Sequence, residues 1–155
     1  MNTLKSQIPI HHQTPVLKGI LETLKESILI TTASVDDPRI VYANIRFLAM
    51  TGYHLEEVLG ETPRILQGPR TNREEISRLK RELSATGYFK NGHAINYRKD
   101  RSEYVVEWDI SPIFDDEGVL IYYVSIQRDV TDLFEAKRQI DMLNEQIQGY
   151  LHKAH

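Results

Sequence analysis

The segment VLIYYVSIQRDV (residues 119–130) decides the fold of this chain, because it predicts a β-strand with no polar face. Successive side chains of a strand point to opposite sides of its sheet. One side of this strand carries Ile121, Tyr123, Ser125 and Gln127, and the other carries Leu120, Tyr122, Val124 and Ile126. If one side lines the core, a terminal helix or a second subunit must cover the other.

The segments around this strand predict an α+β fold. Runs rich in β-branched and aromatic residues predict four more strands, at 27–33, 39–43, 88–98 and 103–114. Helices are predicted between the second and third of these, at 44–51, 54–59 and 71–86. Short polar connectors join the last three strands and are typical of hairpins. We therefore expect a five-stranded antiparallel sheet with short helices on one face and amphipathic helices at both ends.

Capping signals predict where three helices begin. Thr14 followed by Pro15 predicts the N-cap and first position of an N-terminal amphipathic helix. A capping box, in which two side chains satisfy free backbone N–H groups, is predicted for two more helices. The capping-box pairs are Thr71 with Glu74 and Asp132 with Glu135.

The C-terminal segment predicts a helix with an apolar heptad seam. The seam consists of Leu133, Ala136, Ile140, Leu143, Ile147 and Tyr150, which recur three and four residues apart. About three heptads are marginal for a coiled coil that stands alone. We therefore expect a homodimer through the terminal helices and the outer sheet face. The predicted units are an N-terminal extension and helix at 1–26, a central domain at 27–131 and a C-terminal helix at 132–155.

The composition narrows the function classes. A chain of 155 residues with 26% charged residues and a net charge of −3 predicts one globular domain with neither nucleic acid nor membrane as partner. With no signal peptide and no apolar run of 18 residues, we expect a cytoplasmic protein. The sequence contains no cysteine, which excludes disulfides and thiolate chemistry, and its scattered histidines predict no metal site.

Several motifs together resemble a PAS domain over roughly residues 17–131. Within that superfamily the chain is most similar to the flavin-binding light-oxygen-voltage (LOV) group and to flavin redox-sensor PAS domains. The closer resemblance depends on Arg64-Ile65-Leu66-Gln67-Gly68 combined with Asn96-Tyr97 and Ile126-Gln127. The general PAS motifs are Tyr42-Ala43-Asn44, Met50-Thr51-Gly52-Tyr53, Asn96-Tyr97-Arg98-Lys99-Asp100, Ile110-Ser111-Pro112-Ile113 and Ile126-Gln127-Arg128-Asp129-Val130-Thr131.

The resemblance implies a flavin cofactor and assigns five residues to it. Asn96 would meet the polar edge of the flavin ring, and Gln127 would contact its O4 and N5 atoms. An amide suits N5, because it offers both a donor and an acceptor to a nitrogen that changes protonation. Arg64 and Gln67 would lie on the ribityl and phosphate side, with Lys80 as a second cation for the phosphate.

Four further residues bear on the flavin site, three of them because they differ from the LOV pattern. Pro63 stands where a photoactive LOV domain has the cysteine that bonds to the flavin, so no adduct can form. Thr62 and Val106 replace two asparagines that would contact the ring, and each lost hydrogen bond costs about 1 kcal/mol. By strand alternation Trp108 shares a face with Val106, so it is either an electron donor to the flavin or a core aromatic.

The cofactor is expected to be FMN rather than FAD, because the phosphate region has no insertion for an adenine. Arg70 and Arg73 lie nearby in the sequence, so FAD remains the alternative.

The resemblance implies a sensory module rather than an enzyme. It would signal flavin redox state or blue light through N5 protonation, Gln127 and the terminal helices of a dimer, to a separate downstream protein. The alternative is a PAS interaction module without flavin, or one that binds heme or a small metabolite. A flavin-dependent oxidoreductase is disfavoured, because the sequence contains no substrate-facing acid, base or nicotinamide site.

Overall fold

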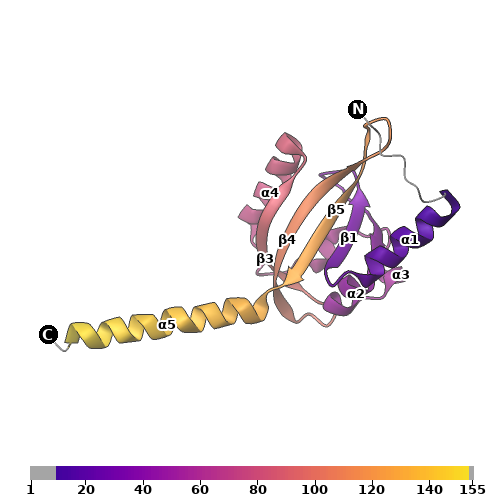
Figure 1. Ribbon diagram of the computed structural model, residues 1–155. Helices are drawn as coiled ribbons and strands as arrows, with labels where there is room; N and C mark the ends of the chain where they lie inside the picture. The colour runs from indigo at the N-terminus through magenta and orange to yellow at the C-terminus, as the bar shows by residue number, and fades with distance from the viewer. Residues whose placement is uncertain (1–9, 154–155) are drawn as a thin grey trace.

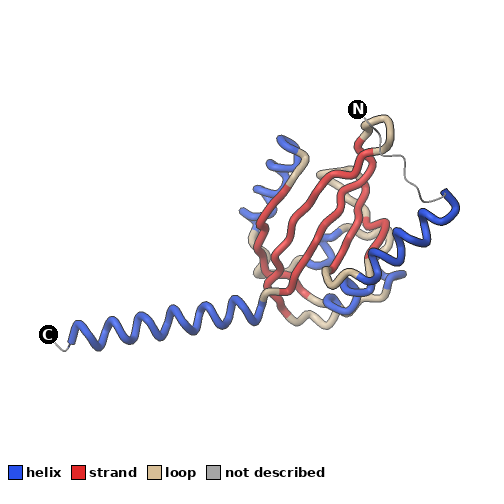
Figure 2. Tube along the Cα trace, viewed as in Figure 1, coloured by secondary structure: helices blue, strands red, loops and turns tan. Residues whose placement is uncertain are grey.

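The computed structural model describes residues 10–153, with side chains from residue 15 onward. Five antiparallel strands form one sheet, and helices pack against one of its faces (Figures 1 and 2). The predicted fold is therefore confirmed. In chain order the elements are α1 (Ile10–Thr23), β1 (Ser27–Thr32), β2 (Ile40–Ala43), α2 (Ile45–Thr51), α3 (Leu55–Val58), the 3-10 helix η1 (Pro63–Leu66), α4 (Arg73–Thr86), β3 (Phe89–Tyr97), β4 (Glu103–Phe114), β5 (Leu120–Asp129) and α5 (Thr131–Lys153).

The last strand of the chain lies at the centre of the sheet. The strand order is β2-β1-β5-β4-β3, so β5 pairs with β1 on one side and β4 on the other. Gln127 on β5 is directly opposite Ser27 on β1 and Trp108 on β4. Residues opposite each other share one face of a sheet. Gln127 and its neighbours Tyr123 and Ser125 are all buried, as expected for the inner side of this strand.

Two hydrophobic clusters fill the space between the sheet and the helices. One lies under α4 and the other under α2 and α3. The first cluster contains Leu83, Phe89, Ala94, Tyr104, Val106, Trp108 and Tyr123, and the second contains Leu29, Ile40, Ala43, Phe47, Val58 and Leu66.

Asn44 connects α1, β1 and α2 through hydrogen bonds of its side chain. Its side chain is 1% exposed and makes four hydrogen bonds to backbone groups. Its Oδ1 accepts from the N–H groups of Ile28 (2.9 Å) and Phe47 (3.0 Å), so it caps α2 and holds the start of β1. Its Nδ2 donates to the carbonyls of Leu21 (3.1 Å) and Glu26 (2.9 Å), which fixes the end of α1.

Three predicted helix starts are wrong. Helix α1 begins at Ile10, so Pro15 lies inside the helix rather than at its first position. Pro15 has no backbone N–H, so one hydrogen bond of the helix is missing at this residue. The side chain of Thr14 lies outside the described part of the chain. Helix α4 is capped by Asn72, whose Oδ1 accepts from the N–H groups of Glu74 and Glu75.

The third correction concerns the start of α5. Oδ1 of Asp129 accepts from the backbone N–H (3.0 Å) and the hydroxyl (2.6 Å) of Thr131, and this fixes the first residue of the helix. Asp132 is consequently already inside α5 and does not form the predicted box with Glu135.

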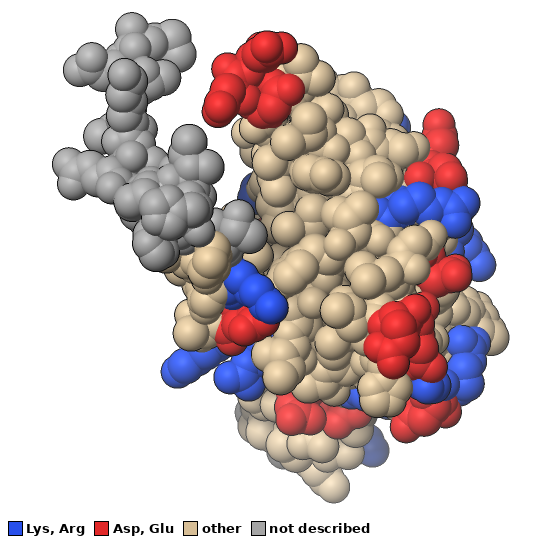
Figure 3. Space-filling view, turned by 90° about the vertical axis from the view of Figure 1, so that its right-hand side faces the viewer, with Lys and Arg blue, Asp and Glu red and all other residues tan. Residues whose placement is uncertain are grey.

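Helix α5 projects away from the sheet and has no buried residue (Figure 1). Its apolar seam is exposed, so it does not cover the outer face of its own sheet, which was one of the two expected arrangements. Within residues 10–153, no helix combines the length and the apolar character that crossing a membrane requires. On the face shown in Figure 3, acidic and basic side chains are interspersed around a broad uncharged surface.

We expect Asn44→Ala to lower the free energy of unfolding by about 2 to 4 kcal/mol, because it removes a helix cap and leaves buried backbone groups without partners. Urea unfolding measures the change. The matched control is Asn72→Ala, which removes the exposed cap of α4 and should cost only about 1 kcal/mol. Equal losses in the two variants would contradict the bridging role of Asn44.

Candidate functional site

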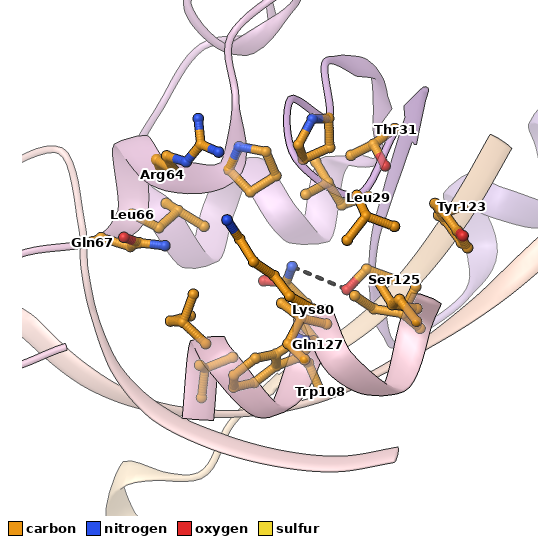
Figure 4. Close-up of a pocket in the computed structure, with 18 of the residues that line it drawn as sticks. Leu29, Thr31, Arg64, Leu66, Gln67, Lys80, Trp108, Tyr123, Ser125 and Gln127 are labelled. Atoms are coloured by element: carbon orange, nitrogen blue, oxygen red, sulfur yellow. Dashed lines mark hydrogen bonds between the residues drawn. The ribbon is translucent and has the colours of Figure 1, made fainter. Parts of the chain in front are cut away.

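A cavity lies between the two hydrophobic clusters, with β-strands on one side and η1, α4 and the loop between β1 and β2 on the other (Figure 4). Its lining is mostly apolar. Of the nine residues predicted from sequence, eight line this cavity and Thr62 does not. The eight are Pro63, Arg64, Gln67, Lys80, Asn96, Val106, Trp108 and Gln127.

Gln127 places an amide on the floor of the cavity. Its side chain is 6% exposed, and its Nε2 donates to Oγ of Ser125 at 3.2 Å, the dashed contact in Figure 4. Its Oε1 is buried and has no donor among the described residues. A buried carbonyl oxygen without a donor costs about 1 to 3 kcal/mol. The cavity therefore fits a ligand that offers an N–H or O–H group at this atom.

Asn96 supplies a second amide, from β3. Its Nδ2 lies 3.5 Å from the hydroxyl of Tyr104, at the outer limit of a hydrogen bond. Tyr104 is 1% exposed, and this burial raises the pKa of its hydroxyl to about 12. The guanidinium of Arg98 stacks over the Tyr104 ring, 4.6 Å from its centroid, and its Nη2 donates to Asp129 at 2.8 Å. Asn96 is thus connected, through Tyr104 and Arg98, to Asp129, which holds the first residue of α5.

Two cations lie at the mouth of the cavity, and both contact Asp36 in the loop between β1 and β2. Arg64 donates to the backbone carbonyl of Asp36, and Nζ of Lys80 lies 3.7 Å from its carboxylate. The carboxylate is 91% exposed. An ion pair this exposed contributes about 0 to 1 kcal/mol, so an anionic ligand could replace Asp36 at little cost.

The other basic residues at this end have partners within the protein. Nη1 of Arg73 donates to Oε1 of Gln67 at 3.0 Å, and Arg70 forms an ion pair of 2.7 Å with Glu103. Neither arginine lines the cavity.

A close approach between Gly68 and Tyr97 fixes the loop that carries Arg64 and Gln67. A Cβ on Gly68 would lie 2.3 Å from the Tyr97 ring, so only glycine fits against it. The Tyr97 hydroxyl accepts from the backbone N–H of Arg70 at 3.0 Å. The hydroxyl of Thr71, predicted to cap α4, instead accepts from the N–H of Gly68 at 2.8 Å.

The residues that depart from the LOV pattern also have defined places. Pro63 begins η1 and contacts the cavity, while Thr62 caps η1 without a side-chain hydrogen bond. Val106 is 1% exposed and offers only methyl groups to the cavity. Trp108 is buried, with its ring 5.2 Å from that of Phe89 at a tilt of 40°.

Ser125 is a polar cavity residue that the sequence analysis did not single out. It lines the cavity and holds the Gln127 amide. Alternation placed it on the same side of the strand as Tyr123 and Gln127, but no motif marked it as a polar contact.

The donor set of the cavity fits a flavin. Apolar walls suit the ring, the amides of Gln127 and Asn96 suit its polar edge, and Arg64 with Lys80 suits a phosphate at the mouth. Among the described residues, no three histidine, aspartate or glutamate side chains are grouped closely enough to hold a metal ion.

Comparison with known proteins gives a consistent set of relatives. A family model described as the PAS domain matches residues 25–132. Phototropin-2 of Oryza sativa is 34% identical over 119 residues, 77% of this chain and 13% of the relative. A blue-light photoreceptor of Listeria monocytogenes is 35% identical over 119 residues, 77% of this chain and 46% of the relative. The chain thus spans less than half the length of these relatives.

Solved structures give the same likeness. A structure from work on LOV domain mechanism with a flavin analogue superimposes with a TM-score of 0.69 at 31% identity. The match covers 87% of this chain and 98% of that one.

The raised pKa of Tyr104 predicts a loss of stability at alkaline pH. The unfolded tyrosine loses its proton near pH 10, whereas the folded one keeps it to about 12, so the unfolded state binds fewer protons between these values. The free energy of unfolding should fall over this range by up to about 2 to 3 kcal/mol from this group.

Urea unfolding at a series of pH values measures this fall, which should be smaller in Tyr104→Phe. Tyr150→Phe removes an exposed hydroxyl from α5 and should leave the fall unchanged. A fall of the same size in Tyr104→Phe and in the native protein would show that this hydroxyl is not responsible.

Proposed function

The chain belongs to the PAS domain family, and from that premise we propose that it is a sensory module that binds a flavin, preferring FMN to FAD. The buried amide of Gln127 carries the proposal. Its Oε1 has no donor among the described residues, although it lies in an apolar cavity where an unsatisfied acceptor is costly.

Each part of the cavity would take one part of the ligand. Gln127 and Asn96 would hydrogen-bond the polar edge of the ring, and the flanking apolar residues would exclude water from it. Arg64 and Lys80 would exchange their contacts with Asp36 for the phosphate. Neither Arg70 nor Arg73 lines the cavity, which favours a single phosphate and hence FMN.

The bound flavin would supply reversible electron transfer coupled to protonation at N5. With no cysteine in the chain, a thiol adduct is not available, and Pro63 leaves only a methylene surface at the corresponding place. The Trp108 indole, buried in the cavity wall, would be an electron donor to the ring. Blue light or a cellular reductant would be the input.

The output would pass from β5 to α5. Gln127 lies two residues before Asp129, which holds the first residue of α5 and pairs with Arg98. A rotation of the Gln127 amide would therefore alter the contacts at the start of α5. The exposed seam of α5 would pair with the same helix of a second chain, and a separate protein would receive the signal.

Substitution of both cations, Arg64→Ala with Lys80→Ala, should weaken FMN binding by about tenfold per cation, because charge-assisted contacts to the phosphate are lost. Riboflavin has no phosphate, so its affinity should stay the same. Fluorescence titration of the flavin-free protein measures both. Arg81→Ala with Lys137→Ala is the matched control, since it removes two positive charges from exposed sites on α4 and α5.

Equal weakening of FMN and riboflavin would contradict a phosphate site at these cations. A native protein that is colourless and takes up neither compound would favour the interaction module without flavin.

The pair of substitutions Ile140→Lys and Leu143→Lys should convert a dimer into a monomer, because charges replace two apolar seam residues that are 58% and 56% exposed. Light scattering at equal protein concentration measures the mass. Glu145→Lys with Gln148→Lys adds lysines away from the seam and should leave the dimer intact. An unchanged mass in the seam variant would exclude α5 from the interface.

A further inference from the structure

The loop between β1 and β2 places an acidic side chain beside the two cations at the mouth of the cavity. Arg64 donates to the backbone carbonyl of Asp36, and Nζ of Lys80 lies 3.7 Å from the Asp36 carboxylate. We propose that Asp36 is a specificity-determining residue, whose charge competes with a ligand phosphate for these cations and so narrows the preference for FMN over riboflavin. The inference rests on the proposed function.

The loop is held in place by contacts that do not involve the two cations. The backbone N–H of Thr32 donates to the carbonyl of Arg39 at 2.8 Å, and the N–H of Arg39 donates to Oγ1 of Thr32 at 3.0 Å. These two bonds close the base of the loop. Within it, the N–H of Asp37 donates to Oγ of Ser34 at 3.0 Å. A ligand that took the cations from Asp36 would therefore leave the loop, with its charge, at the cavity mouth.

The same loop forms part of the cavity wall. Ser34, Val35 and Pro38 line the cavity, and Val35 packs against the hydrophobic cluster under α4. The carboxylate of Asp36 is 91% exposed, so it faces water rather than the apolar walls. Asp36 should therefore act on the charged end of a ligand and not on its ring.

The neighbouring acid of the loop has a partner of its own. Nε and Nη2 of Arg39 donate to Oδ2 of Asp37 at 3.1 and 3.0 Å. Arg39 is fixed further by its Nη1, which donates to the carbonyl of Gly60 at 3.2 Å. The charge of Asp37 is thus balanced within the loop, and Asp36 is the acid that acts on the cavity cations.

The charges give the direction of the effect. A phosphate monoester carries about −1.5 to −2 charges at pH 7. Its binding would replace the contact between Lys80 and Asp36 and add repulsion from the Asp36 carboxylate. Riboflavin ends in a hydroxyl at the same point, so its binding meets neither cost.

The test is fluorescence titration of the flavin-free protein with FMN and with riboflavin, in the native chain and in Asp36→Asn. Asparagine keeps the shape of the side chain and the backbone carbonyl that Arg64 contacts, so only the charge is lost. The affinity for FMN should rise about fivefold, and that for riboflavin should stay the same. Because Asp36 offsets one of two positive charges, FMN binding should also fall more steeply with added salt in Asp36→Asn.

Two further variants separate the charge of Asp36 from other effects of substitution. Asp36→Glu keeps a negative charge in the same loop and should bind FMN as the native protein does. Asp116→Asn removes the same charge from the exposed turn between β4 and β5, which does not line the cavity, and should leave both affinities unchanged.

An FMN affinity that is unchanged or lower in Asp36→Asn would overturn the role of Asp36, as would an equal rise for riboflavin or an equal rise in Asp116→Asn. If neither the native chain nor Asp36→Asn takes up either compound, the proposed function is wrong and the inference with it. Binding of both compounds with the same ratio of affinities in the two proteins removes the inference alone.

Discussion

The buried amide of Gln127 is the constraint on which the site depends. It lies on the central strand of the sheet, between β1 and β4, and is 6% exposed, so its only access is through the cavity. One N–H of the amide is donated to Ser125, and Oε1 has no donor within the described chain. A buried acceptor without a donor costs about 1 to 3 kcal/mol of stability. The cavity is therefore arranged to bind a ligand and not for stability alone.

Other contacts in the structure fix the elements that surround Gln127. Asn44 joins α1, β1 and α2 and so fixes one edge of the sheet. The contact of Gly68 with Tyr97 fixes the loop that brings the cations to the mouth of the cavity. Asp129 couples the end of β5 to the start of α5. A ligand on Gln127 would therefore act on a strand whose far end is the base of an exposed helix.

Much of this could be predicted from the sequence, because alternation and turn chemistry are local. The grouping of Tyr123, Ser125 and Gln127 on one side of β5 and the placing of Trp108 with Val106 follow from a period of two residues. The helix caps could not be predicted in the same way. Thr71 has the right residue type for a cap, but its hydroxyl is taken by the backbone of Gly68, and Asn72 caps α4 instead. Ser125 was missed because its contact with the Gln127 amide is a matter of side-chain geometry that no motif marks.

The most direct test of the central claim follows the side-chain amide resonances of Gln127 and Asn96 by nuclear magnetic resonance, while the flavin-free protein is titrated with FMN. The account predicts saturable shifts of both resonances at the same FMN concentration, with the amide of Gln139 on α5 far less affected. Binding of FMN without a change at Gln127, or no binding at all, would contradict it.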